Sequence, residues 1–163
     1  MGKPMPPHTA ANLRLRAHHL LCVFGFRDLG YSDAFVANMR RIVDAFYSKQ
    51  GVEVELVAGP DDICGACPHM REGKCRATQD ADEAVRAKDA CVSDRLGLLP
   101  GGRYNSSWLA CRTVAGIAPE ALADICGGCR WLSAGYCAEG LARRRGQLSG
   151  AREEGTGSAS HRG

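Results

Sequence analysis

A cysteine pattern that occurs twice constrains this chain more than any other feature of its sequence. Both copies read D-I-C-G-x-C-x5-G-x-C, and corresponding positions lie 62 residues apart (126 − 64 = 62). Two cysteines separated by two residues can point both sulfurs at one metal centre when the backbone turns tightly between them. Each copy is therefore a candidate metal-binding loop, with Cys64, Cys67 and Cys75 in the first cysteine loop (64–75) and Cys126, Cys129 and Cys137 in the second (126–137).

Glycines are expected to shape each loop, because glycine tolerates positive φ and a close approach of the backbone. Some lie between the paired cysteines, and others precede the third cysteine and can swing it back toward the pair. Each loop then offers three thiolates, one fewer than a closed four-coordinate site needs. We expect Asp62 and Asp124 to cap their loops through backbone N–H groups. The glycines concerned are Gly65, Gly73, Gly127, Gly128 and Gly135.

Two explanations other than metal binding account for less of this pattern. Buried cysteines that pack as small apolar side chains need neither a fixed spacing nor intervening glycines. A redox dithiol of the thioredoxin kind needs only C-x2-C and leaves the third cysteine of each loop without a role. A metal site uses all three cysteines, so the sequence indicates metal binding.

The overall composition fits a reducing compartment. The chain has nine cysteines in 163 residues, and residues 1–12 contain no apolar run of the kind found in a signal peptide. No stretch approaches the ~20 apolar residues of a membrane span. We therefore expect a cytoplasmic protein without a membrane partner, in which clustered cysteines stay reduced and bind metal. The formal net charge of +3 is small, and we expect no nucleic-acid partner.

Hydrophobic periodicity predicts an α+β fold that is mostly helical, with a small two-stranded sheet and metal-binding cysteine loops. Alternating residues predict strands at 13–16 and 52–57. Helical periodicity, with Ser32 and Ser106 as expected N-caps, predicts helices at 18–26, 33–49, 80–98, 106–117, 119–125 and 138–145. A single cysteine-rich metal-binding domain then spans residues 12–147, between tails at 1–11 and 148–163 whose composition predicts disorder.

Residues outside the two loops can supply the missing ligands. Cys22 lies four residues after His18 on a predicted helix, and we expect it to complete a site with the first cysteine loop. Cys111 precedes the second loop and is the candidate for the second site. For His18 and His19, metal ligation competes with a role as hydrogen-bonded core residues. Cys91 lies in the middle of a predicted helix and is expected to pack as a thiol.

The spacing leaves the identity of the metal open. Structural zinc favours two C-x2-C pairs that converge on one ion, which would leave Cys75 and Cys137 unused. Iron–sulfur clusters take cysteines from a tight loop and from a distant residue, which suits three clustered cysteines and one remote cysteine better. We therefore expect one or two iron–sulfur clusters of the [4Fe–4S] type, with zinc as the alternative.

The run Leu13–Cys22, the segments Gly30–Ser32 and Gly59–Cys64, and the second cysteine loop carry a resemblance to a known family. Over about residues 13–140 the chain resembles the small prokaryotic proteins called domain of unknown function 1284. The resemblance implies iron–sulfur binding, with no reaction assigned. It leaves out Cys91 and Cys111, and the ligands that it implies are Cys22, Cys64, Cys67, Cys75, Cys126, Cys129 and Cys137.

These observations predict a small iron–sulfur protein that transfers electrons to an unidentified redox protein or senses redox state. A zinc-stabilised binding module is one alternative, in which metal supports a core with only 6% aromatic residues. An enzyme is the other, because a cluster held by three cysteines leaves one iron open to substrate. The sequence contains no GxGxxG, Walker loop or Gly-x-Ser-x-Gly motif that would indicate a further cofactor or a nucleophilic serine.

Overall fold

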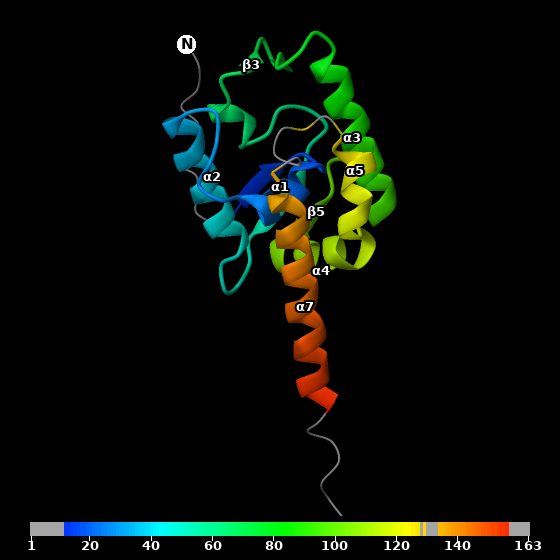
Figure 1. The fold of residues 1–163 in the computed structure, drawn as a ribbon. Coiled ribbons are helices and arrows are strands. Elements are labelled where there is room, and N and C mark those ends of the chain that lie inside the picture. Colours follow the sequence, from blue (N-terminus) through cyan, green and yellow to red (C-terminus); the bar gives the residue numbers. More distant parts are fainter. Residues whose placement is uncertain (1–11, 128, 130–133, 157–163) are drawn as a thin grey trace, which may run out of the picture.

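A small mixed sheet lies at the centre of the fold, with helices around it (Figure 1). The computed structural model describes residues 12–127, 129 and 134–156, with backbone alone over 148–156. Strand β1 (Asn12–Leu15) pairs in parallel with β2 (Glu53–Leu56), and β2 pairs antiparallel with β5 (Arg103–Asn105). Both predicted strands are confirmed. The third strand, β5, was missed because three residues are too short to show an alternating pattern.

The parallel pairing of β1 and β2 requires a crossover, and two helices supply it. They are α1 (His19–Gly25) and α2 (Asp33–Phe46). Ser32 caps α2 as predicted, because its hydroxyl accepts a hydrogen bond from the Phe35 N–H at 3.1 Å. The apolar stripe of α2 is buried against the core through Phe35, Met39, Ile42 and Phe46.

Three α-helices lie between the end of the first cysteine loop and the start of the second. They are α3 (Ala81–Leu96), α4 (Ser106–Gly116) and α5 (Leu122–Ile125), the last preceded by the 3-10 turn η2 (Pro119–Ala121). The predicted cap Ser106 was wrong by one residue, because the Asn105 side chain accepts the Ser107 N–H at 2.9 Å. Ser106 is buried and accepts the Val52 N–H at 3.0 Å, which ties α4 to the sheet.

The last helix, α7 (Tyr136–Thr156), is longer than the predicted 138–145. Its first turns pack against α1, with Leu141 only 1% exposed, and its C-terminal half projects from the body of the molecule (Figure 1). Once a packed turn has nucleated a helix, each further residue adds one backbone hydrogen bond at small cost. The helix therefore includes residues 148–156, for which composition predicted disorder, while 1–11 and 157–163 lie outside the described residues.

The predicted class, α+β and mostly helical, is confirmed by this arrangement. The alternating strand residues meet on one buried side, where Leu13 lies opposite Val54 and Leu15 opposite Leu56. Among the described residues, no helix combines the length and the apolar character needed to cross a bilayer. The core fixes the positions of the cysteines, because they lie on loops and helices packed around it.

Candidate metal centre

One cavity gathers cysteines from distant parts of the chain. It has a volume of about 640 Å³, and residues of α1, α2, α3 and both cysteine loops line it. Cys91 on α3 and the exposed Cys111 on α4 are not among the lining residues. All nine cysteines are free thiols. Seven of them line the cavity: Cys22, Cys64, Cys67, Cys75, Cys126, Cys129 and Cys137.

The two cysteine loops begin with the same backbone turn. In the first, the 3-10 turn η1 (Cys64–Ala66) is closed by the Cys67 N–H, which donates to the Cys64 carbonyl at 3.0 Å. In the second, the Cys129 N–H donates to the Cys126 carbonyl at 2.9 Å. Each turn brings its cysteine pair to the cavity wall, so C-x2-C spacing has the same structural consequence in both loops.

The third cysteine of each loop follows a glycine in the left-handed region. Gly73 has φ +73° and Gly135 has φ +82°, conformations that cost other residues about 1–2 kcal/mol. Beyond these glycines the loops differ. Cys75 lies on strand β4 (Lys74–Cys75), which pairs with β3 (Met70–Arg71), whereas Cys137 lies in the first turn of α7.

The glycines between the paired cysteines act only in part as predicted. Gly65, which lies in the 3-10 turn η1, and Gly127 do not adopt positive φ. A methyl group on Gly127 would lie 2.9 Å from the Ala123 carbonyl oxygen, so this glycine allows a close approach of the backbone. Nothing lies within 4 Å of a methyl group built on Gly65. Gly128 lies outside the described residues.

Cys22 lies beside the second cysteine loop, whereas the sequence interpretation grouped it with the first. Its helix α1 packs against α7 so closely that a methyl group on Gly25 would lie 2.5 Å from the Cys137 Sγ. Burial raises the pKa of Cys22 well above its usual range, and the charges of Cys137, Cys129 and Cys126 raise it further. The spacing of His18 and Cys22 defines a helix face but not the neighbour of that face.

Asp61, rather than the predicted Asp62, caps the first loop. Its buried carboxylate accepts the Cys64 N–H at 3.0 Å, the Arg16 N–H at 2.7 Å and the ring Nδ1 of His19 at 2.6 Å. Burial alone would raise the pKa of Asp61, but these partners hold that pKa below its usual range. Asp62 instead accepts the Arg14 N–H at 2.8 Å and so joins β1 to the loop.

The second predicted cap, Asp124, lies in α5 and is exposed. Its position matches Asp62 in the repeat, but a helix precedes Cys126, whereas a turn at Asp62 and Ile63 precedes Cys64. The Cys126 N–H donates to the Leu122 carbonyl at 2.8 Å, so the helix end itself satisfies the backbone there. The second loop therefore needs no side-chain cap at Cys126.

His18 belongs to a second buried carboxylate network. The Asp89 side chain, on α3, accepts from the Arg16 Nε at 2.7 Å and pairs with the His18 Nδ1 at 2.6 Å. Burial and the adjacent His19 lower the pKa of His18 to about 4, against the opposing effect of Asp89. The imidazole is therefore neutral near pH 7. The Nη2 of Arg16 is buried and has no hydrogen-bond partner among the residues that the structure describes, and Arg16 also lines the cavity.

The electrostatics of the cavity suit a ligand that brings positive charge to the sulfurs. Burial and the charge of Asp61 raise the pKa of Cys64 to about 12, and burial with Cys129 and Cys126 raises that of Cys137 to about 11. These thiols are protonated near pH 7, which disfavours a metal-free reactive dithiol, whose pKa must be lowered. A metal would displace their protons and stabilise the thiolates.

Three cationic side chains line the cavity that holds the cysteines. Arg16, Arg27 and Lys88 line the cavity, and none of its lining residues in the described part of the chain is Asp or Glu. A metal cluster held by several thiolates carries net negative charge, and such a wall would compensate that charge. The buried networks around Asp61 and Asp89 were not found from the sequence, although the pair Asp61-Asp62 directly before the first loop was a visible signal.

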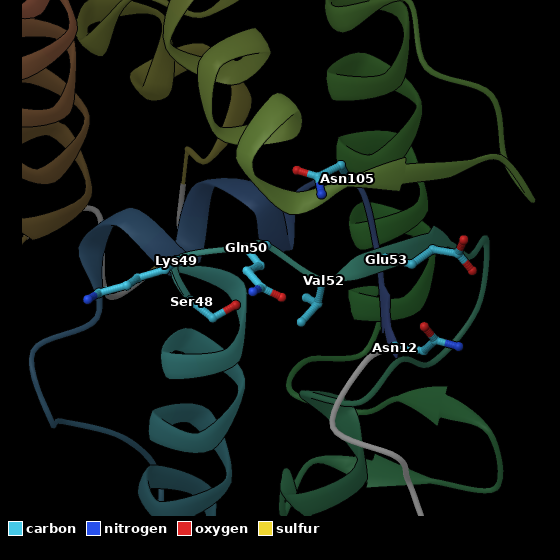
Figure 2. Close-up of a pocket in the computed structure, with 8 residues that line it drawn as sticks. Asn12, Ser48, Lys49, Gln50, Val52, Glu53 and Asn105 are labelled. Carbon is cyan, nitrogen blue, oxygen red and sulfur yellow. The ribbon is translucent and has the colours of Figure 1, made fainter.

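A second depression does not resemble a site. It has a volume of about 720 Å³ and lies where the chain passes from α2 to β2. Figure 2 shows that its side chains do not converge, since Lys49 and Glu53 point to opposite sides. It contains no cysteine or histidine; its lining residues are Asn12, Ser48, Lys49, Gln50, Gly51, Val52, Glu53 and Asn105.

Comparison with known proteins gives a family and no function. A family model described as "Protein of unknown function (DUF1284)" matches residues 30–135, which include both cysteine loops except Cys137. The chain belongs to this family. No curated protein and no solved structure matches the chain. Function therefore has to be argued from the cavity.

Proposed function

We propose that this chain is an iron–sulfur protein that binds its clusters in the cavity between the two cysteine loops. One observation carries the proposal. Of the nine cysteines, the six of the two cysteine loops and Cys22 line a single cavity, and Cys91 and Cys111 do not. Packing of thiols as small apolar side chains gives no reason for that separation, whereas metal ligation does.

The second centre has a full set of four thiolates. Cys126 and Cys129 come from one turn, Cys137 from the start of α7, and Cys22 from α1, which packs on α7 at Gly25. Three cysteines from a short loop and one from a distant helix is the ligand arrangement expected of a [4Fe–4S] cluster.

The first centre has three thiolates from Cys64, Cys67 and Cys75. Because Cys22 serves the second centre and Cys111 lies away from the cavity, no fourth cysteine is available here. Backbone N–H groups of the turned loop and the cationic wall of the cavity would set the potential of a bound cluster.

Electron transfer or redox sensing in the cytoplasm is the role that this arrangement suits. The cavity reaches the surface beside Arg27 and Leu29, which line it and are exposed, so a redox protein partner can approach a bound cluster closely. The free thiols are compatible with a reducing compartment.

An enzyme is a second candidate, favoured by the three-thiolate first centre. A cluster with three protein ligands leaves one iron open, and His18, His19 and Arg16 lie on the same cavity wall. A substrate that binds this iron would change the visible and EPR spectra of the first centre. Absence of such a change with any small carboxylate or hydroxy acid would leave the electron-transfer role.

Anaerobic purification, followed by an absorption spectrum and by iron, zinc and acid-labile sulfide analysis of the same sample, tests the proposal. We expect a brown protein with ~4 irons per chain for one cubane cluster or ~8 for two, and equal sulfide. A colourless protein with stoichiometric zinc and no sulfide contradicts the proposal and indicates the zinc-stabilised module.

A further inference from the structure

We propose that His19 is the fourth ligand of the first centre, bound through its Nε2, so that this centre has three cysteines and one histidine. The inference rests on the proposed function for the presence of a metal centre, and it names a ligand that the cysteine pattern does not contain. It follows from how one buried carboxylate holds His19 and Cys64 together.

Asp61 decides which ring nitrogen of His19 is available. The distance from His19 Nδ1 to the Asp61 Oδ2 is 2.6 Å, and the Asp61 side chain is completely buried. A metal-binding histidine commonly donates its other ring N–H to a carboxylate, which fixes the tautomer and the ring orientation. With Nδ1 engaged by Asp61, Nε2 is the nitrogen left to coordinate, on a side chain that lines the cavity.

Asp61 itself is not a ligand in this arrangement. Its Oδ1 accepts the Cys64 N–H, and its Oδ2 accepts both His19 and the Arg16 N–H. His19, Asp61 and Cys64 offer ligand atoms that all lie within 4.8 Å of one another. With the carboxylate satisfied by three donors and Nδ1 engaged by it, the groups that remain for a metal are the His19 Nε2 and the Cys64 sulfur.

The other cavity histidines are placed differently. His18 pairs through Nδ1 with Asp89, which also holds the Arg16 guanidinium and contacts no cysteine backbone. His69 is part of the first loop, but its ring packs edge-on against Tyr31 at 4.7 Å between centroids. His19 alone among these three shares a carboxylate partner with a cysteine of the first loop.

This ligand set makes the two centres electronically different. A neutral imidazole in place of a thiolate lowers the negative charge of the first centre by one, and histidine ligation raises the potential of a cluster. The first centre should therefore reduce at a more positive potential than the all-cysteine second centre. It would also have no open iron, which separates this inference from the enzyme candidate.

Pulsed EPR of the reduced full-length protein, with and without ¹⁵N-histidine, tests the inference. We expect strong coupling from one directly bound nitrogen, with the frequency change that ¹⁵N requires. His19→Ala should lose this coupling together with the iron of the first centre. His19→Cys should keep the iron, lose the coupling and shift the first-centre potential to a more negative value.

His69→Ala is the matched control, and it should retain both the coupling and the iron. Full iron and sulfide without nitrogen coupling, or coupling that persists in His19→Ala, would overturn the inference while leaving the proposed function intact. If the chain binds zinc instead, the proposed function fails. The NMR chemical shifts of the His19 ring nitrogens, measured with and without zinc, then test ligation by His19 separately. A metal-dependent shift of the His19 Nε2 supports ligation, and its absence overturns it.

Discussion

The two cysteine loops share one sequence pattern and one backbone turn, but the protein holds them in different ways. The paired cysteines are joined by equivalent hydrogen bonds of 3.0 and 2.9 Å, and Gly73 and Gly135 have almost the same φ. The first loop is fixed by polar contacts to the buried Asp61 carboxylate. The second is fixed by close packing of α1 on α7, at Gly25 and Gly140.

This difference shows that a repeated ligand pattern does not fix the completed site. Under the proposed function, each loop supplies three thiolates, and the elements packed beside the loop supply the fourth ligand. Next to the second loop, α1 offers Cys22, and next to the first it offers His19, three residues earlier on the same helix. Under the proposed function, one helix would serve both centres with two side chains that are three residues apart.

The strongest test of the comparison is Cys22→Ser. We expect it to remove the second centre and to leave the first, so that iron and sulfide fall by about half, from ~8 to ~4 per chain for two cubane clusters. Anaerobic metal and sulfide analysis measures this change. Cys91→Ser and Cys111→Ser are matched controls away from the cavity and should keep the wild-type iron. Loss of the first centre and retention of the second would reverse our assignment.

Asp61→Asn should weaken the first loop selectively. The amide cannot accept from all three donors, so a buried N–H or the His19 ring loses its partner, and we expect the unfolding free energy of the metal-free protein to fall by about 2–4 kcal/mol. Urea titration measures this loss. Asp62→Asn, which perturbs one exposed hydrogen bond, is the comparison and should cost about 1 kcal/mol or less. Equal losses for the two variants would contradict the role given to Asp61.

Gly25→Ala should weaken the second loop selectively. The added methyl group would lie 2.5 Å from the Cys137 Sγ and 2.7 Å from its Cα, so α1 and α7 must separate. We expect a loss of about 1–3 kcal/mol in the unfolding free energy, with reduced iron at the second centre only. Gly65→Ala meets no atom within 4 Å and should change stability by less than about 0.5 kcal/mol. A first centre that fails in Gly25→Ala would show that the two loops are not independent.

The smallest expected difference is between Gly73→Ala and Gly135→Ala. Both residues adopt left-handed backbone conformations, and no atom lies within 3.4 Å of a methyl group built on either. Each variant should lose about 1–2 kcal/mol of unfolding free energy, and the two losses should agree within about 0.5 kcal/mol. Thermal and urea unfolding of the metal-free proteins measure both. A clear inequality would mean that the two turns are not equivalent.

Local features of the fold were largely predictable, since they depend on neighbouring residues. The alternation around Leu13 and Val54 and the Ser32 cap have local causes, and the structure confirms them. The short strand β5 and the exchange of roles between Asn105 and Ser106 were not predictable, because both depend on where α4 meets the sheet.

The sequence predicted which cysteines line the cavity, but it did not predict how they divide between the two proposed centres. Spacing identified the loops, and the resemblance added Cys22, yet neither says against which loop α1 packs. That depends on the close approach at Gly25, which sequence periodicity does not reveal. Asp61 was missed for a related reason, because the repeat drew attention to Asp62 and Asp124, whereas the network is built around the residue before them.

A Mössbauer spectrum of the ⁵⁷Fe-enriched protein, recorded beside that of Cys22→Ser, tests the central claim most directly. The account predicts cluster iron in two distinguishable centres in the wild-type protein, of which the variant keeps one. A wild-type protein without cluster iron, or a variant whose spectrum matches the wild type in both intensity and form, would contradict it.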